Sequence, residues 1–273
     1  MEPLHDSLNE QENKTHNEGI SWILLEIVLI VSILFIARTV HLLHNVRKIR
    51  LMKDPRTISP LTNLLSKEKT TSKRPLKTLV VLGSGGHTTE MLHLIKNLNP
   101  DHYYPVVLIV ATTDTTSLRR VQAYPHSLPV QNKDNLIEEE KNNNGGRIYR
   151  IPRSREVGQS YWSSILTTMY SFFFAFWLVG FKVQPDLILV NGPGTCLPIA
   201  VSAFLFRIVG WMDETKIIFV ESFCRVTSLS LTGKLLYPIA DLFVVCWEQL
   251  HEVYPLTYLV TSFIPKTIDR QKR

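Results

Sequence analysis

Residues 80–91 read V-V-L-G-S-G-G-H-T-T-E-M, an apolar run that passes through three glycines into a helix-like segment. A turn of this kind places backbone N–H groups and the positive end of a helix at the tip of a strand. A second glycine loop, N-G-P-G-T at 191–195, follows another apolar run. Glycine lacks a Cβ, so the backbone of both loops can approach an anion closely. Either loop alone could be a simple tight turn, but the pair favours a diphosphate site.

Apolar runs rich in β-branched residues alternate with helix-length segments from residue 76 onward. Strands are expected near 78–82, 105–110, 147–151, 186–190, 216–220 and 241–246, and helices near 88–98, 115–123, 159–180, 195–210 and 230–238. Strands that are apolar throughout are typical of a parallel sheet covered on both faces. We therefore predict an α/β fold, a Rossmann-like doubly wound parallel sheet over 76–260. Both glycine loops would then lie at the carboxyl edge of the sheet, where such folds bind ligands.

Residues 20–37 form an apolar run of about the minimum length that crosses a bilayer. Glu26 is the one charge in the run, and it lies near enough to the start to reach the interface by snorkelling. The bases that follow the run place the C-terminal side in the cytosol by the positive-inside rule. We expect a lumenal tail at 1–19, a single transmembrane anchor at 20–37 and a basic linker at 38–75. A buried helix of a soluble protein is the alternative for the apolar run.

A second uncharged segment, 161–181, is also long enough to be considered as a membrane span. Crossing the bilayer there would leave the strands before and after it on opposite sides of the membrane. We favour a helix that lies against the sheet and turns its Phe/Trp face to a membrane surface or a partner. Residues 131–146 are low in complexity and polar, as expected of a surface loop.

Several classes of protein are disfavoured by composition and motif. The formal net charge is +6, but the bases lie largely in the linker, which argues against nucleic-acid binding. Three cysteines, Cys196, Cys224 and Cys246, make neither a disulfide framework nor a metal-binding spacing. Thr88 stands where a dinucleotide fingerprint needs Gly or Ala, and no P-loop is present. We expect no metal and no cofactor.

Two side chains could carry chemistry at the predicted edge of the sheet. His87 follows the glycines, so its imidazole could donate to a phosphate, accept a proton from an alcohol, or simply pack at the turn. Thr88 or Thr89 could cap the helix that begins there. Glu221 ends the 216–220 strand, and it could be a general base, a ligand of a sugar hydroxyl or the partner of Arg225 in a structural ion pair.

Four ordered motifs closely resemble one eukaryotic family. They are V-L-G-S-G-G-H-T-T-E-M-L (81–92), I-P-R-S-R-E-V (151–157), P-D-L-I-L-V-N-G-P-G-T-C-L-P (185–198) and V-E-S-F-C-R-V (220–226). The family is the membrane-anchor subunit of the UDP-N-acetylglucosamine transferase that adds the second GlcNAc to the dolichol-linked precursor of N-glycans. The chain is also distantly similar to the N-terminal half of the bacterial lipid-linked peptidoglycan GlcNAc transferase, on Gly85, Gly86, His87, Gly192, Gly194 and Glu221.

The resemblance implies the acceptor-side half of a GT-B glycosyltransferase split between two chains. A soluble donor-binding subunit would complete a heterodimer, and the length of this chain leaves room for only one such half. The implied acceptor is dolichyl-diphosphate-GlcNAc, and the enzyme of the preceding GlcNAc-phosphate transfer is a further candidate partner. The implied reaction is inverting, forms a β1,4 bond without an obligatory metal, and is not performed by this chain alone. The implied place is the endoplasmic reticulum membrane or the nuclear envelope, with the folded domain facing the cytosol.

The resemblance also implies roles for individual residues. His87 is the first candidate for the general base and Glu221 the second, and either could instead hold the acceptor. The residues expected at the acceptor diphosphate are Gly83, Ser84, Gly85, Gly86, Thr88, Asn191, Gly192, Gly194, Thr195, Arg153 and Arg155. Arg155 could equally pair with a structural carboxylate.

The chain departs from the family pattern at its C-terminal end. Val260 stands where glycine is common, and the tail at 261–273 is an extension that could help to dock the partner or be an addition. Two other functions remain open from the sequence: a recruiter that only brings a soluble enzyme to the membrane, and a membrane-anchored nucleotide-dependent oxidoreductase.

Overall fold

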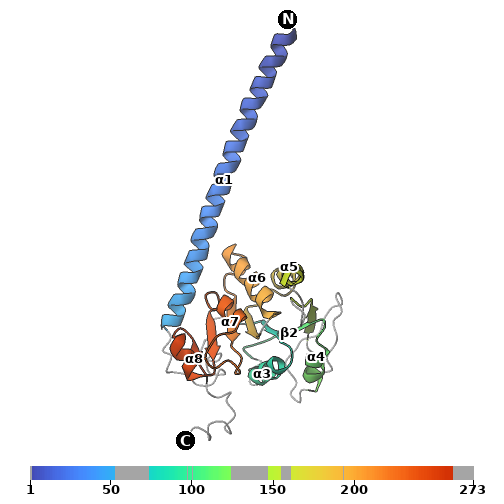
Figure 1. Cartoon of the computed structure of the whole chain (residues 1–273), viewed down its shortest axis with the longest axis vertical. Helices are drawn as coiled ribbons and strands as arrows, with labels where there is room; N and C mark the ends of the chain where they lie inside the picture. Colours follow the sequence, from blue (N-terminus) through green and yellow to red (C-terminus); the bar gives the residue numbers. More distant parts are fainter. Residues whose placement is uncertain are drawn as a thin grey trace. The chain divides into compact units, whose positions relative to one another are not determined.

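A computed structural model of the chain describes residues 2–52, 74–96, 98–99, 101–123, 147–154, 161–192 and 194–260. The chain divides into two compact units, one up to His44 and a larger one from Asn45 onward. The first unit is a single length of helix, and the second holds the sheet and the remaining helices (Figure 1). Arg155, the loop 131–146 and the tail 261–273 lie outside the described residues.

Helix α1 runs from Glu2 to Met52, so residues 38–52, assigned above to the linker, are helical. Its segment Trp22–Leu51 is long and apolar enough to cross a membrane. Large apolar side chains from Trp22 to Ile36 are exposed. A helix that is apolar on all sides needs a non-aqueous environment, so α1 is a candidate membrane anchor.

The described strands form one seven-stranded parallel sheet in the order β3-β2-β1-β4-β5-β6-β7. They are β1 (Thr78–Val81), β2 (Val106–Ala111), β3 (Arg147–Ile151), β4 (Leu187–Asn191), β5 (Lys216–Val220), β6 (Leu242–Val245) and β7 (Tyr258–Leu259). The six expected strands are confirmed to within one residue at each end, and the Rossmann-like α/β prediction is confirmed with them. The two-residue β7 was not foreseen.

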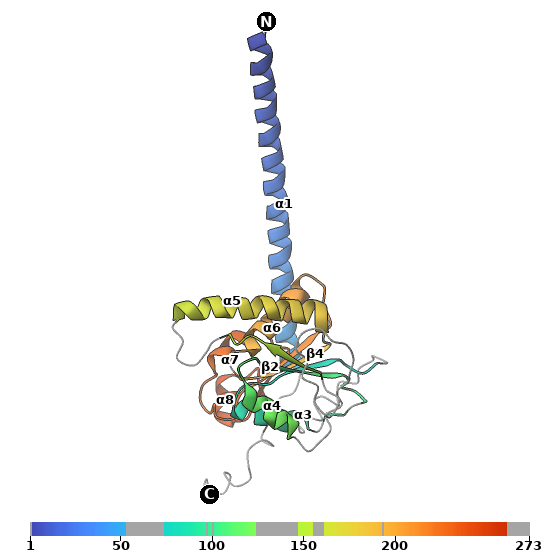
Figure 2. The same cartoon turned by 90° about the vertical axis from the view of Figure 1, so that its right-hand side faces the viewer.

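Helices cover both faces of this sheet (Figure 2). Along the chain they are α3 (Gly86–Ile95), α4 (Thr115–Gln122), α5 (Tyr161–Trp177), which continues as the π-helix η1 (Leu178–Val183), α6 (Cys196–Ile208), α7 (Leu231–Leu236) and α8 (Glu248–Val253). Helices α5 and α6 pack together on one face, and α3 and α4 lie on the other. All residues of β1, β2, β4 and β6 are buried, which explains why these strands read as unbroken apolar runs.

The order of the strands reverses between β1 and β4. The chain goes from β1 outward to β2 and β3, then returns to β4 on the other side of β1. Because β1 and β4 are parallel neighbours, with Val81 opposite Val190, the loops that follow them emerge side by side at the carboxyl edge. This switch point is where doubly wound sheets bind ligands.

The topology also decides between the two alternatives for residues 161–181. Strand β3 precedes this segment, β4 follows it, and both belong to the same sheet. The segment therefore cannot cross a bilayer between them, although Ser164–Val183 has the length and composition of a span. Ser171 and Ala175 are fully buried, so α5 lies against the domain as expected.

Candidate functional site

The two glycine loops meet around His87. A Cβ added at Gly83, after β1, would lie 2.8 Å from the Cβ of His87. A Cβ added at Gly192, after β4, would lie 2.7 Å from the Cγ of His87, and Gly192 has a φ of +95°. Both positions therefore require glycine, because any larger residue would displace the histidine. The imidazole is held between the loops at the switch point of the sheet.

A hydrogen-bond network sets the tautomer of His87. The Oδ1 atom of Asn191 lies 2.9 Å from the Nδ1 atom of His87, within hydrogen-bond distance. The Nδ2 group of Asn191 donates to Glu90 Oε2 at 2.9 Å, which orients the amide. Nδ1 of a neutral His87 must then carry the proton, and Nε2 keeps its lone pair. Nε2 has no hydrogen-bond partner in the described part of the chain.

Glu90 is the acidic centre of this network. Its Oε1 accepts from the Ser222 hydroxyl at 3.0 Å, and its Oε2 lies 3.6 Å from His87 Nδ1, an ion-pair distance rather than a hydrogen bond. The Glu90 carboxylate raises the pKa of His87, partly opposed by burial and assisted by Asn191. Burial would raise the pKa of Glu90, but the contacts with His87, Asn191 and Ser222 together lower it. The pair therefore favours an imidazolium beside a carboxylate until the pH exceeds the raised pKa of His87.

The carboxylate of Glu221 is buried and accepts hydrogen bonds from neighbouring residues of the protein. Its carboxylate accepts from the backbone N–H of Ser222 at 3.1 Å, and from the N–H and hydroxyl of Ser230 at 2.9 and 3.0 Å. The residue is only 1% exposed, and burial raises its pKa against these hydrogen bonds. Arg225 acts on the carboxylate through its charge and is the smallest of these influences. The geometry assigns Glu221 to holding Ser230 at the start of α7.

The helices that follow the two glycine loops begin without a side-chain cap. Gly85, with a φ of +66°, is the N-cap of α3, and Thr195 is the N-cap of α6. The expectation that Thr88 or Thr89 caps the first helix is wrong, because α3 begins at Gly86. N–H groups in the first turn of a helix have no partner within the helix, so an anion can accept from them.

Open space adjoins this part of the loops. A Cβ built on Gly85, Gly86 or Gly194 would meet no atom within 4 Å. Arg153, from the segment after β3, donates to the Ser84 hydroxyl at 3.0 Å. A guanidinium therefore reaches the first glycine loop, and Ser84, Gly85, Gly86 and Arg153 are brought together.

Two of the expected diphosphate residues have other contacts. Thr88 is fully buried, and its hydroxyl donates to the Gly83 carbonyl and contacts Ser117. Asn191 is 1% exposed, and its amide serves His87 and Glu90. Their side chains hold the loop and the histidine in place instead of facing a ligand.

The family model described as oligosaccharide biosynthesis protein Alg14 like matches residues 78–262, which include this whole site. The chain belongs to the Alg14 family. A mouse protein named UDP-N-acetylglucosamine transferase subunit ALG14 is 44% identical over 195 residues, covering 71% of this chain and 86% of the mouse protein. The human protein of that name is 43% identical over 185 residues, covering 68% and 82%. The one from Candida albicans is 43% identical over 175 residues, covering 64% and 72%. The family expected from the four motifs is confirmed.

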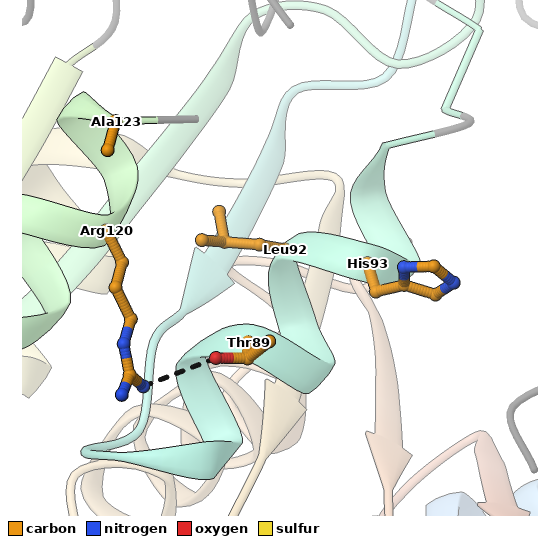
Figure 3. Close-up of a pocket in the computed structure, with 5 residues that line it drawn as sticks. All are labelled: Thr89, Leu92, His93, Arg120 and Ala123. Carbon is orange, nitrogen blue, oxygen red and sulfur yellow. Dashed lines mark hydrogen bonds between the residues drawn. The ribbon is translucent and has the colours of Figure 1, made fainter. Parts of the chain in front are cut away.

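Two further residues of the Alg14-family site escaped the sequence analysis. Glu90 lies three positions after His87 on α3, a spacing that puts two side chains on one face of a helix and could have been recognised. Arg120, on α4, donates to the Gly85 carbonyl and to Thr89 Oγ1, the latter at 3.3 Å (Figure 3). A pocket of about 300 Å³ lies there, lined by Thr89, Leu92, His93, Arg120 and Ala123. No local signal connects Arg120 with a loop 35 residues earlier.

The described residues of this Alg14-family chain include no group of three His, Cys, Asp or Glu side chains able to hold a metal ion. Cys196, Cys224 and Cys246 are free. Burial raises the pKa of Cys196 and of Cys246 to about 12, so both are inert thiols at neutral pH.

Proposed function

We propose that this chain is the membrane-anchoring, acceptor-binding subunit of a two-chain UDP-GlcNAc transferase. Its product would be GlcNAc2-diphosphate-dolichol, made at the cytosolic face of the endoplasmic reticulum. The names of its relatives support a subunit role, and α1 supports attachment to a membrane. The one Rossmann-like sheet of the described residues corresponds to one half of a GT-B enzyme, which supports a second, donor-binding chain.

The observation that carries the proposal is the state of His87. The imidazole is clamped between two glycine loops, Asn191 Oδ1 accepts a hydrogen bond from Nδ1–H, and in the neutral form Nε2 keeps its lone pair. A base in this state can remove the proton from the 4-hydroxyl of the acceptor GlcNAc. Glu90 supports the assignment because it orients Asn191 and stabilises the imidazolium that forms.

The proposed reaction balances on these groups. The acceptor O4 attacks C1 of the GlcNAc of UDP-GlcNAc from the face opposite UDP, and its proton passes to His87 Nε2. The bond between C1 and the diphosphate oxygen breaks, UDP leaves with the electron pair, and the configuration at C1 inverts to β. The donor would be held by the partner chain, so this chain by itself would be inactive.

The acceptor diphosphate would be held by the open parts of the two loops. The N–H groups at the starts of α3 and α6, around Gly86 and Thr195, would donate hydrogen bonds to its phosphate oxygens. Arg153 would turn from Ser84 to a phosphate oxygen and make charge-assisted hydrogen bonds. Glu221 would act indirectly, because it fixes Ser230 and its charge helps to raise the pKa of His87.

The test is co-expression of the chain with the soluble donor-binding subunit. Transfer of GlcNAc from UDP-GlcNAc to a short polyprenyl-type diphosphate acceptor is measured for each chain alone and for the pair. The proposal expects transfer by the pair only, and activity from this chain alone would contradict the split enzyme.

A second arm of this test separates catalysis from recruitment. A chain that only brings its partner to the membrane would lose nothing when His87 is replaced, provided that the complex still forms. Full activity of the His87 variant complex would contradict a catalytic role of this chain, and would mean that the chain only brings its partner to the membrane.

A further inference from the structure

The first half of α5 turns hydroxyl side chains toward the domain, where a surface helix usually has apolar ones. Four of its hydroxyl side chains, Ser164, Thr167, Thr168 and Ser171, lie along one stripe of the helix that faces the domain. Thr167 and Thr168 donate to the Ser154 carbonyl at 2.9 and 3.0 Å, and Ser171 donates to the Pro152 carbonyl at 2.8 Å. The hydroxyls of Thr167, Thr168 and Ser171 therefore make their hydrogen bonds on the inner side of the helix.

The opposite side of α5 is apolar and exposed. The exposed fractions are 74% for Leu166, 50% for Met169, 65% for Tyr170, 63% for Phe173, 43% for Trp177 and 57% for Phe181 in the adjoining π-helix. We call these six residues the outer face of α5. The helix runs along the surface of the domain (Figure 2). A contiguous apolar patch of this kind marks a surface that something other than water covers.

The composition of the outer face favours lipid over protein as the covering partner. Residues 161–181 contain no charged side chain, whereas protein interfaces are edged by polar and charged groups. Tyr and Trp beside aliphatic residues are typical of helices that lie at a bilayer surface. The same chain also carries α1, a candidate membrane span, so a bilayer is within reach of it.

A direct path of contacts connects α5 to the glycine loops. The Ser154 carbonyl accepts hydrogen bonds from Thr167 and Thr168. The Ser154 hydroxyl donates to the Gly194 carbonyl at 3.1 Å. The neighbouring Arg153 donates to Ser84 in the other loop. The depth at which α5 rests would therefore set the height of the acceptor site.

We propose that α5 lies in the plane of the bilayer surface with its outer face among the upper acyl chains. It thereby holds the two glycine loops at the level of the lipid headgroups, where the diphosphate of a polyprenyl carrier lies. The second statement rests on the proposed function, but the contact of α5 with lipid does not.

The experiment uses the full-length chain in phosphatidylcholine vesicles. Cys224, the exposed cysteine, is replaced by serine, and an environment-sensitive fluorophore is attached at Phe173→Cys. Val253→Cys is the matched control, because Val253 on α8 is 61% exposed and both views place α8 away from α5 (Figures 1 and 2). Lipids brominated near the top of the acyl chain should quench the probe at Phe173 at least about threefold more than at Val253.

Each outcome of the quenching experiment decides the lipid contact. Equal quenching at the two sites would overturn the proposal. A Phe173 probe that shifts only when the donor-binding chain is added would also overturn it, because the face would then be a protein interface.

Activity tests the second statement separately. The double variant Leu166→Gln/Phe173→Gln should raise the KM for a long-chain acceptor in vesicles about tenfold, with Val253→Gln as control. It should leave transfer to a short, water-soluble acceptor unchanged, and an equal loss on both acceptors would contradict the positioning role. If the wild-type complex used neither acceptor, the proposed function would fail, and the quenching would still decide the lipid contact.

Discussion

The loops after β1 and β4 differ from the loops after β2 and β5, although all four join a buried strand to a helix at one edge of the sheet. After β2, the side chain of Asp114 accepts from the Ser117 N–H at 3.0 Å and caps α4. After β5, Ser230 accepts from the Gly233 N–H at 2.9 Å and caps α7. The loops after β1 and β4 have no such cap.

The difference shows how one architecture separates stability from binding. A capped helix satisfies its first N–H groups with its own side chain and so contributes to folding stability. An uncapped helix leaves those groups to water or to a ligand. Only the uncapped loops contain glycines that approach His87, so the open N–H groups and the candidate base occur together.

Replacing His87 with alanine is the strongest challenge to this comparison. If the open loops are catalytic, His87→Ala should lower kcat/KM of the two-chain complex about a thousandfold, the usual range for a general base. The assay is GlcNAc transfer, with complex formation checked by gel filtration. Ser230→Ala in the capped loop serves as the control and should stay within about twofold. Similar losses from both variants would remove the distinction.

Gly192→Ala tests whether the histidine depends on the glycines. A methyl group there would collide with the imidazole, and activity should fall about a hundredfold, as expected for a misplaced reacting group. Gly210→Ala is the matched control, because Gly210 also has a positive φ, +79°, but its added Cβ would meet nothing. Both variants should lower the melting temperature through backbone strain. A Gly192→Ala complex as active as Gly210→Ala would disprove the clamp.

Glu90→Gln sharpens the role of the network through the pH dependence of activity. A base must be neutral, so wild-type kcat/KM should rise with pH through the raised pKa of His87. Removing the carboxylate should lower that pKa and move the acid limb of the profile by about one pH unit toward lower pH. The rate at high pH should fall only about tenfold or less. An unmoved acid limb would mean that His87 is not the base.

The same pair predicts a pH dependence of stability. A histidine whose pKa is raised by folding contributes stability below its ordinary pKa, and this is lost as the pH rises through the raised value. A carboxylate whose pKa is lowered by folding contributes stability that is lost as the pH falls through the lowered value. The melting temperature of the wild type should therefore exceed that of Glu90→Gln between the lowered pKa of Glu90 and the raised pKa of His87. The difference should become smaller at lower and at higher pH.

The smallest effect on activity is expected from the capped loops. Ser230→Ala removes the cap of α7 and one hydrogen bond to Glu221, and should cost about 1–2 kcal/mol of folding free energy. Urea unfolding measures this cost. A loss of activity without a loss of stability would show that the loop after β5 takes part in the reaction.

Much of the fold could be predicted because buried strands and helices leave a recognisable apolar pattern over a short stretch of sequence. The strands at 147–151 and 216–220 match β3 and β5 at both ends, and the others match within one residue. Strands buried on both faces are apolar throughout, so their limits are visible in the sequence. Strand β7 has only two residues, and α8 buries only Leu250, so neither carries an apolar pattern that the sequence could show.

Less of the site could be predicted. The glycine loops and His87 were expected together, because parallel topology brings strand ends to one edge. The role of Asn191 was not, since its amide serves a histidine 104 residues away. Arg120 and Ser222 likewise reach Gly85 and Glu90 only through packing. Side-chain partners of this kind depend on rotamers and on helix placement, which no local pattern encodes.

By itself the sequence determined the order of strands and helices, the apolar N-terminal helix and the two turns where only glycine fits, because each follows from hydrophobic period and backbone freedom along a short stretch. Only the tertiary structure decided that the second apolar segment lies on the sheet, that Glu221 is buried as a structural acceptor, and that Glu90 and Asn191 orient His87. Those outcomes depend on groups brought together from distant strands, whose interaction exists only once the sheet has formed.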